Sequence, residues 1–177
     1  ARGNHDITVI VHDNRVYGLT TGQAAPTALK GFKAKSTPSG IIEVPINPIA
    51  LAVTQGATFV GQGFSGDINH LVALIESGIK HKGFSLINVF QPCVTFNPLS
   101  SYAFYRERIY KLDDDYDSSD IRLALDKSME VDTKIPLGVI YKTVRPTYTE
   151  SLIQLSEKTL IANDFTQDID KFASEFI

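Results

Sequence analysis

Residues 57–90, ATFVGQGFSGDINHLVALIESGIKHKGFSLINVF, decide the fold of this 177-residue chain. Two short runs, residues 57–60 and 84–90, are rich in β-branched and aromatic side chains, as buried strands are. Between them, apolar residues recur at spacings of three and four and form one helical stripe: Ile68, Leu71, Leu74, Ile75 and Ile79. Asp67 is placed to cap this helix, and Gly83 follows it as a stop. The segment therefore predicts a strand–helix–strand unit of an α/β sheet.

Two further strands are predicted outside this unit. Residues 7–11 (ITVIV) predict a strand buried on both faces, and residues 137–141 (LGVIY) predict another. Because strands alternate with helices, we expect an α/β fold with a mainly parallel sheet flanked by helices. Residues 17–43, rich in Gly, Thr, Pro and Ser, predict an irregular loop of a length that is often functional.

Four further helices are predicted from capping residues and from apolar spacing. They cover residues 49–54 behind Asn47-Pro48, a segment behind Ser118 or Ser119 that carries Ile121, Leu125 and Met129, residues 150–161, and residues 169–176. The last two indicate that residues 146–177 form a C-terminal helical extension of a domain that spans residues 1–145.

The composition excludes several classes of protein. The formal net charge is −3, with 17 Lys and Arg against 20 Asp and Glu, so nucleic acid is not an expected partner. With one cysteine, the chain can form neither an intramolecular disulfide nor a zinc site of several thiolates. No apolar run approaches the ~18 residues of a membrane span. We therefore expect a cytoplasmic protein with no membrane partner.

Three polar segments are predicted to lie at one edge of the sheet, because each follows a predicted strand. They are residues 12–14 (His-Asp-Asn), residues 61–63 (Gly-Gln-Gly) and residues 91–93 (Gln-Pro-Cys). Ligands of open parallel α/β sheets bind beyond the carboxyl ends of the strands. This shared edge is therefore the candidate site.

The residues alone leave two interpretations of each candidate open. Asn14 and a nearby backbone carbonyl are oxygen ligands that suit Mg²⁺, and Gly18 and Thr20 could approach a phosphate, but the same residues suit a plain Asx turn. A lone cysteine such as Cys93 most often packs as a small apolar side chain, although its position in a loop argues against that. The acidic residues 113–117 lack the Gly and Glu of an EF-hand loop and predict a solvated turn.

Four segments, in order along the chain, resemble the carboxyl-terminal portion of the β subunit of 2-oxoacid:ferredoxin oxidoreductases. They are HDNRVYGLTTGQAAPT (residues 12–27), NPIALAVTQGATFVGQGFSGD (47–67), QPCVTFNP (91–98) and IPLGVIYKTVRPTY (135–148). The resemblance implies a thiamine-diphosphate-binding fold. We expect that fold to be incomplete on its N-terminal side, because the family's Gly-Asp-Gly element and three further cysteines do not occur in these residues.

The resemblance also implies roles for individual residues, carried over position by position. Asn14 would bind Mg²⁺ through its side chain, and Val16 would bind it through its backbone carbonyl. Cys93 would be the last of four ligands to a [4Fe-4S] cluster. Three residues would lie against the diphosphate and the reacting end of thiamine diphosphate: Gly18, Leu19 and Thr20.

The implied function is thiamine-diphosphate-dependent oxidative decarboxylation of a 2-oxoacid to an acyl-coenzyme A, with electrons passing through the cluster to ferredoxin. The implied partners are the α subunit of the same enzyme, ferredoxin, the 2-oxoacid and coenzyme A. Two alternatives stay open: a thiamine-diphosphate-dependent lyase or synthase, and an inactive scaffold or interaction fragment. The context of Cys93 argues against the first, while the missing ligands lead us to expect no activity from the isolated chain.

Overall fold

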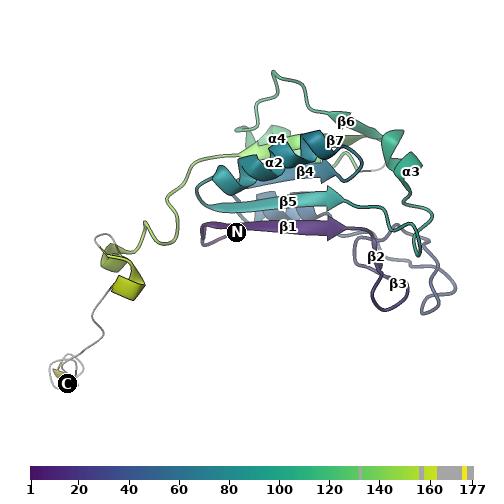
Figure 1. Ribbon diagram of the computed structural model, residues 1–177, viewed down its shortest axis with the longest axis horizontal. Helices are drawn as coiled ribbons and strands as arrows, with labels where there is room; N and C mark the ends of the chain where they lie inside the picture. Colours follow the sequence, from purple (N-terminus) through teal and green to yellow (C-terminus); the bar gives the residue numbers. More distant parts are fainter. Residues whose placement is uncertain (132, 156–157, 163–172, 175–177) are drawn as a thin grey trace.

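A parallel three-stranded unit forms one side of the sheet in the computed structural model, which describes residues 1–131, 133–155, 158–162 and 173–174. The strands are β1 (Ile7–Asp13), β4 (Phe59–Phe64), β5 (Phe84–Phe90), β6 (Ile109–Lys111) and β7 (Ile135–Lys142). Within the described residues they form one sheet in the order β1-β5-β4-β7-β6 (Figure 1). β1, β5 and β4 are parallel, β7 is antiparallel to β4, and β6 is parallel to β7. This confirms the predicted α/β class with a mainly parallel sheet.

Helices cover both faces of this sheet. On one face, α2 (Ile68–Lys80) packs Leu74 against side chains of β4 and β5. On the other face, α1 (Pro48–Thr54) and α4 (Ile121–Ser128) pack against Val60 and Ile140. A fourth helix, α3 (Tyr102–Arg106), lies at the carboxyl end of β5 and was not predicted. Among the described residues, no helix is long and apolar enough to cross a membrane.

The capping residues of α1 and α2 are those predicted from the sequence, whereas the capping residue of α4 is a different one. Asn47 and Asp67 each accept a hydrogen bond from the backbone N–H three residues on, at 3.0 and 3.2 Å, as predicted. At α4 the cap is Asp120, whose carboxylate accepts from the backbone N–H groups of Arg122 and Leu123, so the prediction of Ser118 or Ser119 is wrong. A carboxylate also interacts favourably with the positive end of the helix dipole, which a serine hydroxyl does not.

The C-terminal helix predicted over residues 150–161 is wrong for the residues that the structure describes. They form two 3₁₀ turns, η1 (Ile153–Leu155) and η2 (Leu160–Ala162). A helix in a protein draws most of its stability from packing an apolar face, and Ile161 is almost fully exposed. The helix predicted over residues 169–176 lies outside the described residues except for residues 173–174. The division into residues 1–145 and 146–177 stays a prediction.

The loop predicted over residues 17–43 is mostly irregular, as expected. Its regular part is a small antiparallel hairpin of β2 (Val16–Tyr17) and β3 (Gln23–Ala24), which lies beyond the end of β1 in Figure 1. The hairpin therefore sits at the carboxyl edge of the sheet.

Strand β1 lies at one edge of the described sheet. It pairs with β5 along its whole length, and no other described strand pairs with it. Ile10 is 39% exposed and Ile7 is more exposed still, so the prediction that this strand is buried on both faces is wrong. An edge strand presents unpaired backbone N–H and C=O groups, which are a template for pairing with another chain.

We expect the 177-residue chain to self-associate through β1, and we expect Ile10→Lys to reduce that association, because a charge on an edge strand opposes pairing. Size-exclusion chromatography with light scattering over a concentration series measures the effect. The control Ile79→Lys places the same charge at an exposed position of α2. A chain that stays monomeric at every concentration, or two variants that behave alike, would contradict the role of β1.

Candidate functional site

Two of the three predicted polar segments meet at the carboxyl edge of the sheet. His12 and Asp13 end β1, Asn14 follows them, and residues 91–93 directly follow β5. The Nδ1 atom of His12 lies 2.9 Å from Oε1 of Gln91. The backbone N–H of Gln91 donates to the carbonyl of Asp13 at 3.1 Å. The two segments are therefore joined side by side.

The third segment, residues 61–63, does not follow its strand as predicted but lies inside β4. A Cβ atom on Gly61 or Gly63 would lie 3.0 or 2.8 Å from leucine side chains of α2. These glycines therefore allow the helix to approach the sheet, and they do not end the strand. Gln62 instead donates from Nε2 to the carbonyl of Pro136 at 2.8 Å.

A cavity of about 420 Å³ lies beside the loop that follows β1, and we call it the loop cavity. It is lined by residues 11–20, Ala25 and Thr27. Five of the six predicted site residues are among them: Asn14, Val16, Gly18, Leu19 and Thr20. The structure thus places these five residues around one space.

Asn14 forms the Asx turn that the sequence allowed, with Oδ1 accepting from the backbone N–H of Val16 at 3.1 Å. An amide oxygen has two lone pairs, so this bond leaves one lone pair of Oδ1 for a cation. Arg15, between these two residues, has a φ of 59°, a left-handed conformation that is uncommon outside glycine. The turn and the metal-ligand interpretations of Asn14 are therefore compatible.

The loop then reverses direction in a tight turn. The N–H of Thr21 donates to the carbonyl of Gly18 at 3.1 Å, and the N–H of Gly22 donates to the carbonyl five residues earlier at 2.9 Å. Gly22 has a φ of 111°, and a Cβ atom there would lie 3.3 Å from the ring of Phe96, so this position requires glycine. Leu19 is 98% exposed, and the turn therefore presents an apolar side chain to its surroundings.

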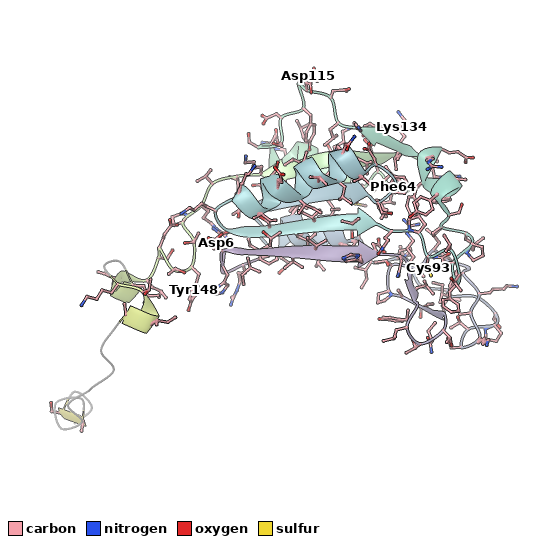
Figure 2. All side chains as sticks on the ribbon, in the orientation of Figure 1. Asp6, Phe64, Cys93, Asp115, Lys134 and Tyr148 are labelled. Carbon is pink, nitrogen blue, oxygen red and sulfur yellow. The ribbon has the colours of Figure 1, made fainter. Side chains whose placement is uncertain are left out.

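Cys93 lies close to this loop, at the carboxyl edge of the sheet (Figure 2). Its Sγ atom is 4.0 Å from the position that a Cβ atom on Gly18 would take, and the half-buried thiol packs in a cluster with Val16 and Phe96. The described residues contain no group of three or more His, Cys, Asp or Glu side chains that could hold a metal ion. The chain alone therefore does not fit a cluster that needs four thiolates.

Asn97 connects the turn that contains Cys93 to the turn that contains Asn14. Its Nδ2 donates to the carbonyl of Asn14 at 3.2 Å, and its backbone N–H donates to the carbonyl of Cys93 at 3.1 Å. Its Oδ1 accepts from the N–H of Ser100 at 3.2 Å. Asn97 is buried, so all three bonds are protected from water. Sequence reasoning did not single out this residue, although an Asn before a Pro is a turn signal.

The residues of the loop cavity fit a hard cation in part. Mg²⁺ prefers oxygen ligands, which the Asn14 side chain and the Val16 carbonyl provide. Asp13 is the one carboxylate among the lining residues, and its Oδ1 accepts a hydrogen bond from the Thr27 hydroxyl at 2.6 Å. The cavity therefore offers two uncharged oxygen ligands, and the Asp13 carboxylate, which lines it, keeps acceptor positions beyond the one bonded to Thr27.

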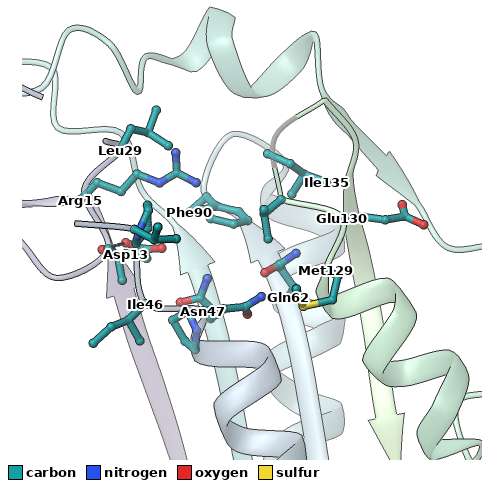
Figure 3. Close-up of a pocket in the computed structure, with 16 residues that line it drawn as sticks. Asp13, Arg15, Leu29, Ile46, Asn47, Gln62, Phe90, Met129, Glu130 and Ile135 are labelled. Carbon is teal, nitrogen blue, oxygen red and sulfur yellow. Dashed lines mark hydrogen bonds between the residues drawn. The ribbon is translucent and has the colours of Figure 1, made fainter. Parts of the chain in front are cut away.

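A second cavity, of about 190 Å³, adjoins the first, and we call it the rim cavity (Figure 3). It shares Asp13, Arg15 and Thr27 with the loop cavity. Its other polar lining residues are Asn47, Gln62, Asn88 and Glu130, and its apolar lining residues are Leu29, Val44, Pro45, Ile46, Pro48, Phe90, Met129, Val131 and Ile135. Sequence reasoning did not predict this cavity.

Arg15 is held in the rim cavity by aromatic rings. Its guanidinium carbon lies 5.6, 5.8 and 5.4 Å from the ring centres of Phe90, Phe104 and Tyr105, distances that allow cation–π attraction. Burial raises the pKa of Tyr105 to about 12. This phenol is therefore neutral at physiological pH, and it offers the guanidinium no negative charge.

Two protein-family models cover most of the chain. Residues 1–89 match the C-terminal TPP-binding domain of thiamine pyrophosphate enzymes, and residues 93–157 match the C-terminal part of the pyruvate ferredoxin oxidoreductase beta subunit. The first match confirms that the fold is of the thiamine-diphosphate-binding type. The second begins at Cys93.

The chain is also similar to individual proteins of this type. It is 47% identical to the 2-oxoacid:ferredoxin oxidoreductase subunit beta of a Sulfolobus species, over 85% of this chain and 53% of that protein. The corresponding subunit of Saccharolobus solfataricus is 41% identical over 97% of this chain and 60% of that protein. A solved structure of 2-oxoglutarate:ferredoxin oxidoreductase from Magnetococcus marinus, with 2-oxoglutarate, coenzyme A and succinyl-CoA bound, superimposes with a TM-score of 0.89 at 35% identity. It covers 99% of this chain and 60% of that one. The chain thus spans between half and three fifths of the length of these relatives.

We expect Asn97→Ala to lower the free energy of unfolding by about 1–3 kcal/mol, because it leaves a buried carbonyl and a buried N–H without partners. Denaturant unfolding measures this loss. Asn69→Ala, at an exposed position of α2, removes the same side chain without breaking a link between loops. Equal stability of the two variants would show that Asn97 does not hold the two turns together.

Proposed function

This chain belongs to the β-subunit family of 2-oxoacid:ferredoxin oxidoreductases, and on that premise we propose that it forms the thiamine-diphosphate-binding part of such a subunit. The observation that carries the proposal is the position of Cys93 beside Gly18. These residues are far apart in the sequence, and the fold brings the predicted cluster ligand against the predicted cofactor loop.

The proposed reaction is the oxidative decarboxylation of a 2-oxoacid to an acyl-coenzyme A, with ferredoxin as the electron acceptor. When bound, thiamine diphosphate supplies the electron sink that decarboxylation requires. The solved relative from Magnetococcus marinus has a 2-oxoacid, coenzyme A and an acyl-coenzyme A bound, which supports this substrate class.

In this proposal the residues of the loop cavity hold and orient the cofactor. Oδ1 of Asn14 and the carbonyl of Val16 bind Mg²⁺, which offsets the charge of the diphosphate. Gly18 lets the backbone approach the diphosphate closely, because it has no side chain. Leu19 and Thr20 lie toward the reacting end, and the Thr20 hydroxyl is oriented by its hydrogen bond to Oε1 of Gln23.

Cys93 is proposed as one thiolate ligand of a [4Fe-4S] cluster whose other ligands come from outside these 177 residues. This role separates the proposal from the lyase or synthase alternative, because enzymes of that kind have no use for a thiolate beside the cofactor loop. The scaffold alternative applies to the chain by itself, since one cysteine cannot hold the cluster.

The proposed protein partners are the α subunit of the same enzyme and ferredoxin. Exposed apolar side chains around the loop cavity and on the following segment support a subunit interface: Leu19, Ile42, Val44 and Ile46. A cytoplasmic location stays part of the prediction.

We expect the 177-residue chain to bind thiamine diphosphate with Mg²⁺ more weakly than the micromolar range, because the carboxylate ligand that the family's Gly-Asp-Gly element gives to the metal does not occur in these residues. Isothermal titration calorimetry measures the affinity. Saturable micromolar binding would contradict the expectation that the cofactor site is incomplete. In the complete enzyme, Asn14→Ala should weaken cofactor binding while Asn69→Ala leaves it unchanged.

We expect Cys93→Ala in the complete enzyme to remove or degrade the cluster and to abolish electron transfer to ferredoxin. The measurements are iron content per subunit and the rate of ferredoxin reduction. Val94→Ala, a change of an exposed neighbour, should leave both unchanged. Full iron content and a normal rate in the Cys93→Ala enzyme would refute the assignment.

A further inference from the structure

Helix α2 has a wider apolar surface than its contact with the sheet requires. At about 100° of rotation per residue, an arc of about 160° around the helix carries no polar side chain. In order around the helix, its residues are Leu74, Gly78, Leu71, Ile75, Ile68, Ile79 and Val72. A helix that packs on one neighbour needs an apolar stripe of about 100°. The width of the arc therefore indicates that α2 is covered from two directions.

One part of this arc faces the sheet. A Cβ atom on Gly61 of β4 would lie 3.0 Å from the side chain of Leu74. A Cβ atom on Gly78 of α2 would lie 2.7 Å from the side chain of Ile87 on β5. Since α2 approaches both strands this closely, it lies over the boundary between β4 and β5.

The other part of the arc is exposed. Ile68 is 69% exposed, Val72 is 51% exposed and Ile79 is 64% exposed, while Ile75 between them is partly buried. These four residues are spaced by four, three and four positions and lie within about 60° of one another around the helix. The same spacing places the apolar residues of a helix against a second helix. The exposed stripe therefore has the pattern of a helix–helix contact.

The exposed stripe faces the β1 side of the sheet. His70 lies on the opposite side of α2, and burial, together with the charge of Lys111 on β6, lowers its pKa. Asp67 forms an ion pair with Lys111 at 2.9 Å, so this side of the helix faces β6. On the β1 side, Thr8 donates from Oγ1 to the carbonyl of Gly78 at 3.2 Å. Figure 1 shows β1 and β6 on opposite sides of α2.

Strand β1 adds an apolar floor beside this stripe. Side chains alternate along a strand, so Ile10 lies on the same face as Thr8, which contacts α2. Ile10 is opposite Ile87, which packs beneath α2, yet it is 39% exposed. We call this apolar surface the α2 shelf, and it consists of Ile68, Val72, Ile75 and Ile79 of the helix and Ile10 of the strand.

The spacing of helices and strands defines where an occupant of the shelf lies. Packed helices are about 8–10 Å apart, and neighbouring strands are about 4.8 Å apart. A helix beside α2 is therefore displaced from it by two strand spacings. It lies over β1 and over the position next to the free side of β1. Such a helix needs further chain beneath it, beyond β1.

A second copy of this chain does not meet that requirement. If two copies paired through their β1 strands, their α2 helices would lie about four strand spacings, or about 19 Å, apart. This is about twice the distance between packed helices, so both shelves would stay uncovered. The interface proposed for the α subunit lies around the loop cavity, at the carboxyl edge of the sheet, and not on this face.

The rest of the β subunit has the length to cover the shelf. This chain matches 53% of the Sulfolobus relative and 60% of the Saccharolobus solfataricus relative, so two fifths or more of each lies outside the match. A parallel sheet is covered by helices on both faces. Chain that extends the sheet at β1 therefore also brings a helix to the face that the shelf occupies.

We propose that the α2 shelf is the docking surface for an amphipathic helix from the part of the β subunit outside these 177 residues. The aliphatic side chains of that helix pack between the exposed stripe of α2 and Ile10. This inference depends on the family to which the chain belongs and not on the proposed reaction.

Photo-cross-linking in the complete enzyme identifies the occupant. p-Benzoylphenylalanine is placed at residue 72 of the shelf or, as the control, at residue 73, an exposed position turned away from the shelf. After irradiation and digestion, mass spectrometry identifies the attached peptide. From residue 72 we expect attachment to β-subunit sequence outside these 177 residues, within a β band of unchanged mass on a denaturing gel. From residue 73 we expect no such product.

Thiol labelling in the complete enzyme measures whether the shelf is covered. Val72→Cys and Ala73→Cys are treated with N-ethylmaleimide, and the labelled α2 peptide is quantified by mass spectrometry. We expect Val72→Cys to react at least about tenfold more slowly than Ala73→Cys, because a thiol between packed helices reacts only when the contact opens. Cysteine is close to valine in size, so this variant keeps the packing.

The inference is overturned if the two thiols react at the same rate, because the shelf is then uncovered in the complete enzyme. It is also overturned if residue 72 attaches to the α subunit, to a second β subunit or to residues 149–177 of this chain, or if it attaches to nothing. If the cross-linking variant does not assemble, the labelling rates decide the outcome. None of these measurements requires enzymatic activity, so failure of the proposed reaction leaves the test intact.

Discussion

The parallel pairing of β1 with β5 is the interaction on which both cavities depend. It places Asp13 opposite Phe90, so that the residues following each strand leave the sheet at the same edge. The hydrogen bonds between residues 12–13 and Gln91, and from Asn97 to Asn14, extend this pairing beyond the strands. A register shift of one residue would turn alternate side chains to the other face and separate these groups.

Strands β4 and β5 carry different kinds of residue on their two faces, and this difference creates the rim cavity. On the α2 face, Gly61 and Gly63 have no side chains, so leucines of the helix pack directly on the strand. On the opposite face, Gln62 and Asn88 stand side by side near the carboxyl ends, beyond the apolar core beneath α1. The polar amides of Gln62 and Asn88 do not extend the apolar core, so the space next to them is left unfilled and is bounded by loops.

Local sequence patterns were sufficient for β1, β4, β5 and β7, for α2 and for two helix caps, because these depend on residues close in the chain, but they missed β6 and the hairpin of β2 and β3. They failed where tertiary structure decides. Glycines were interpreted as the end of β4 although they serve helix packing, and β1 was interpreted as buried on both faces although two of its isoleucines are exposed. The meeting of residues 12–14 with residues 91–93 followed from the strand pattern, whereas the roles proposed for Cys93 and Gly18 came from a family resemblance. The sequence shows Asn88 as one amide side chain in a mostly apolar strand. Whether that amide finds a hydrogen-bond partner depends on the register of β5 against β4, which local sequence does not give.

The loop cavity and the rim cavity differ in how much of each this chain builds. Around the loop cavity, the described residues provide an incomplete set of the proposed ligands: two for Mg²⁺ and one thiolate for a cluster. The free side of β1 lies at the same edge of the sheet. The rim cavity is lined by residues of β1, β4, β5 and β7, of the loop before α1 and of the segment after α4, all from this chain. Two of its polar side chains, Arg15 and Asn88, nevertheless keep atoms without hydrogen-bond partners among the described residues.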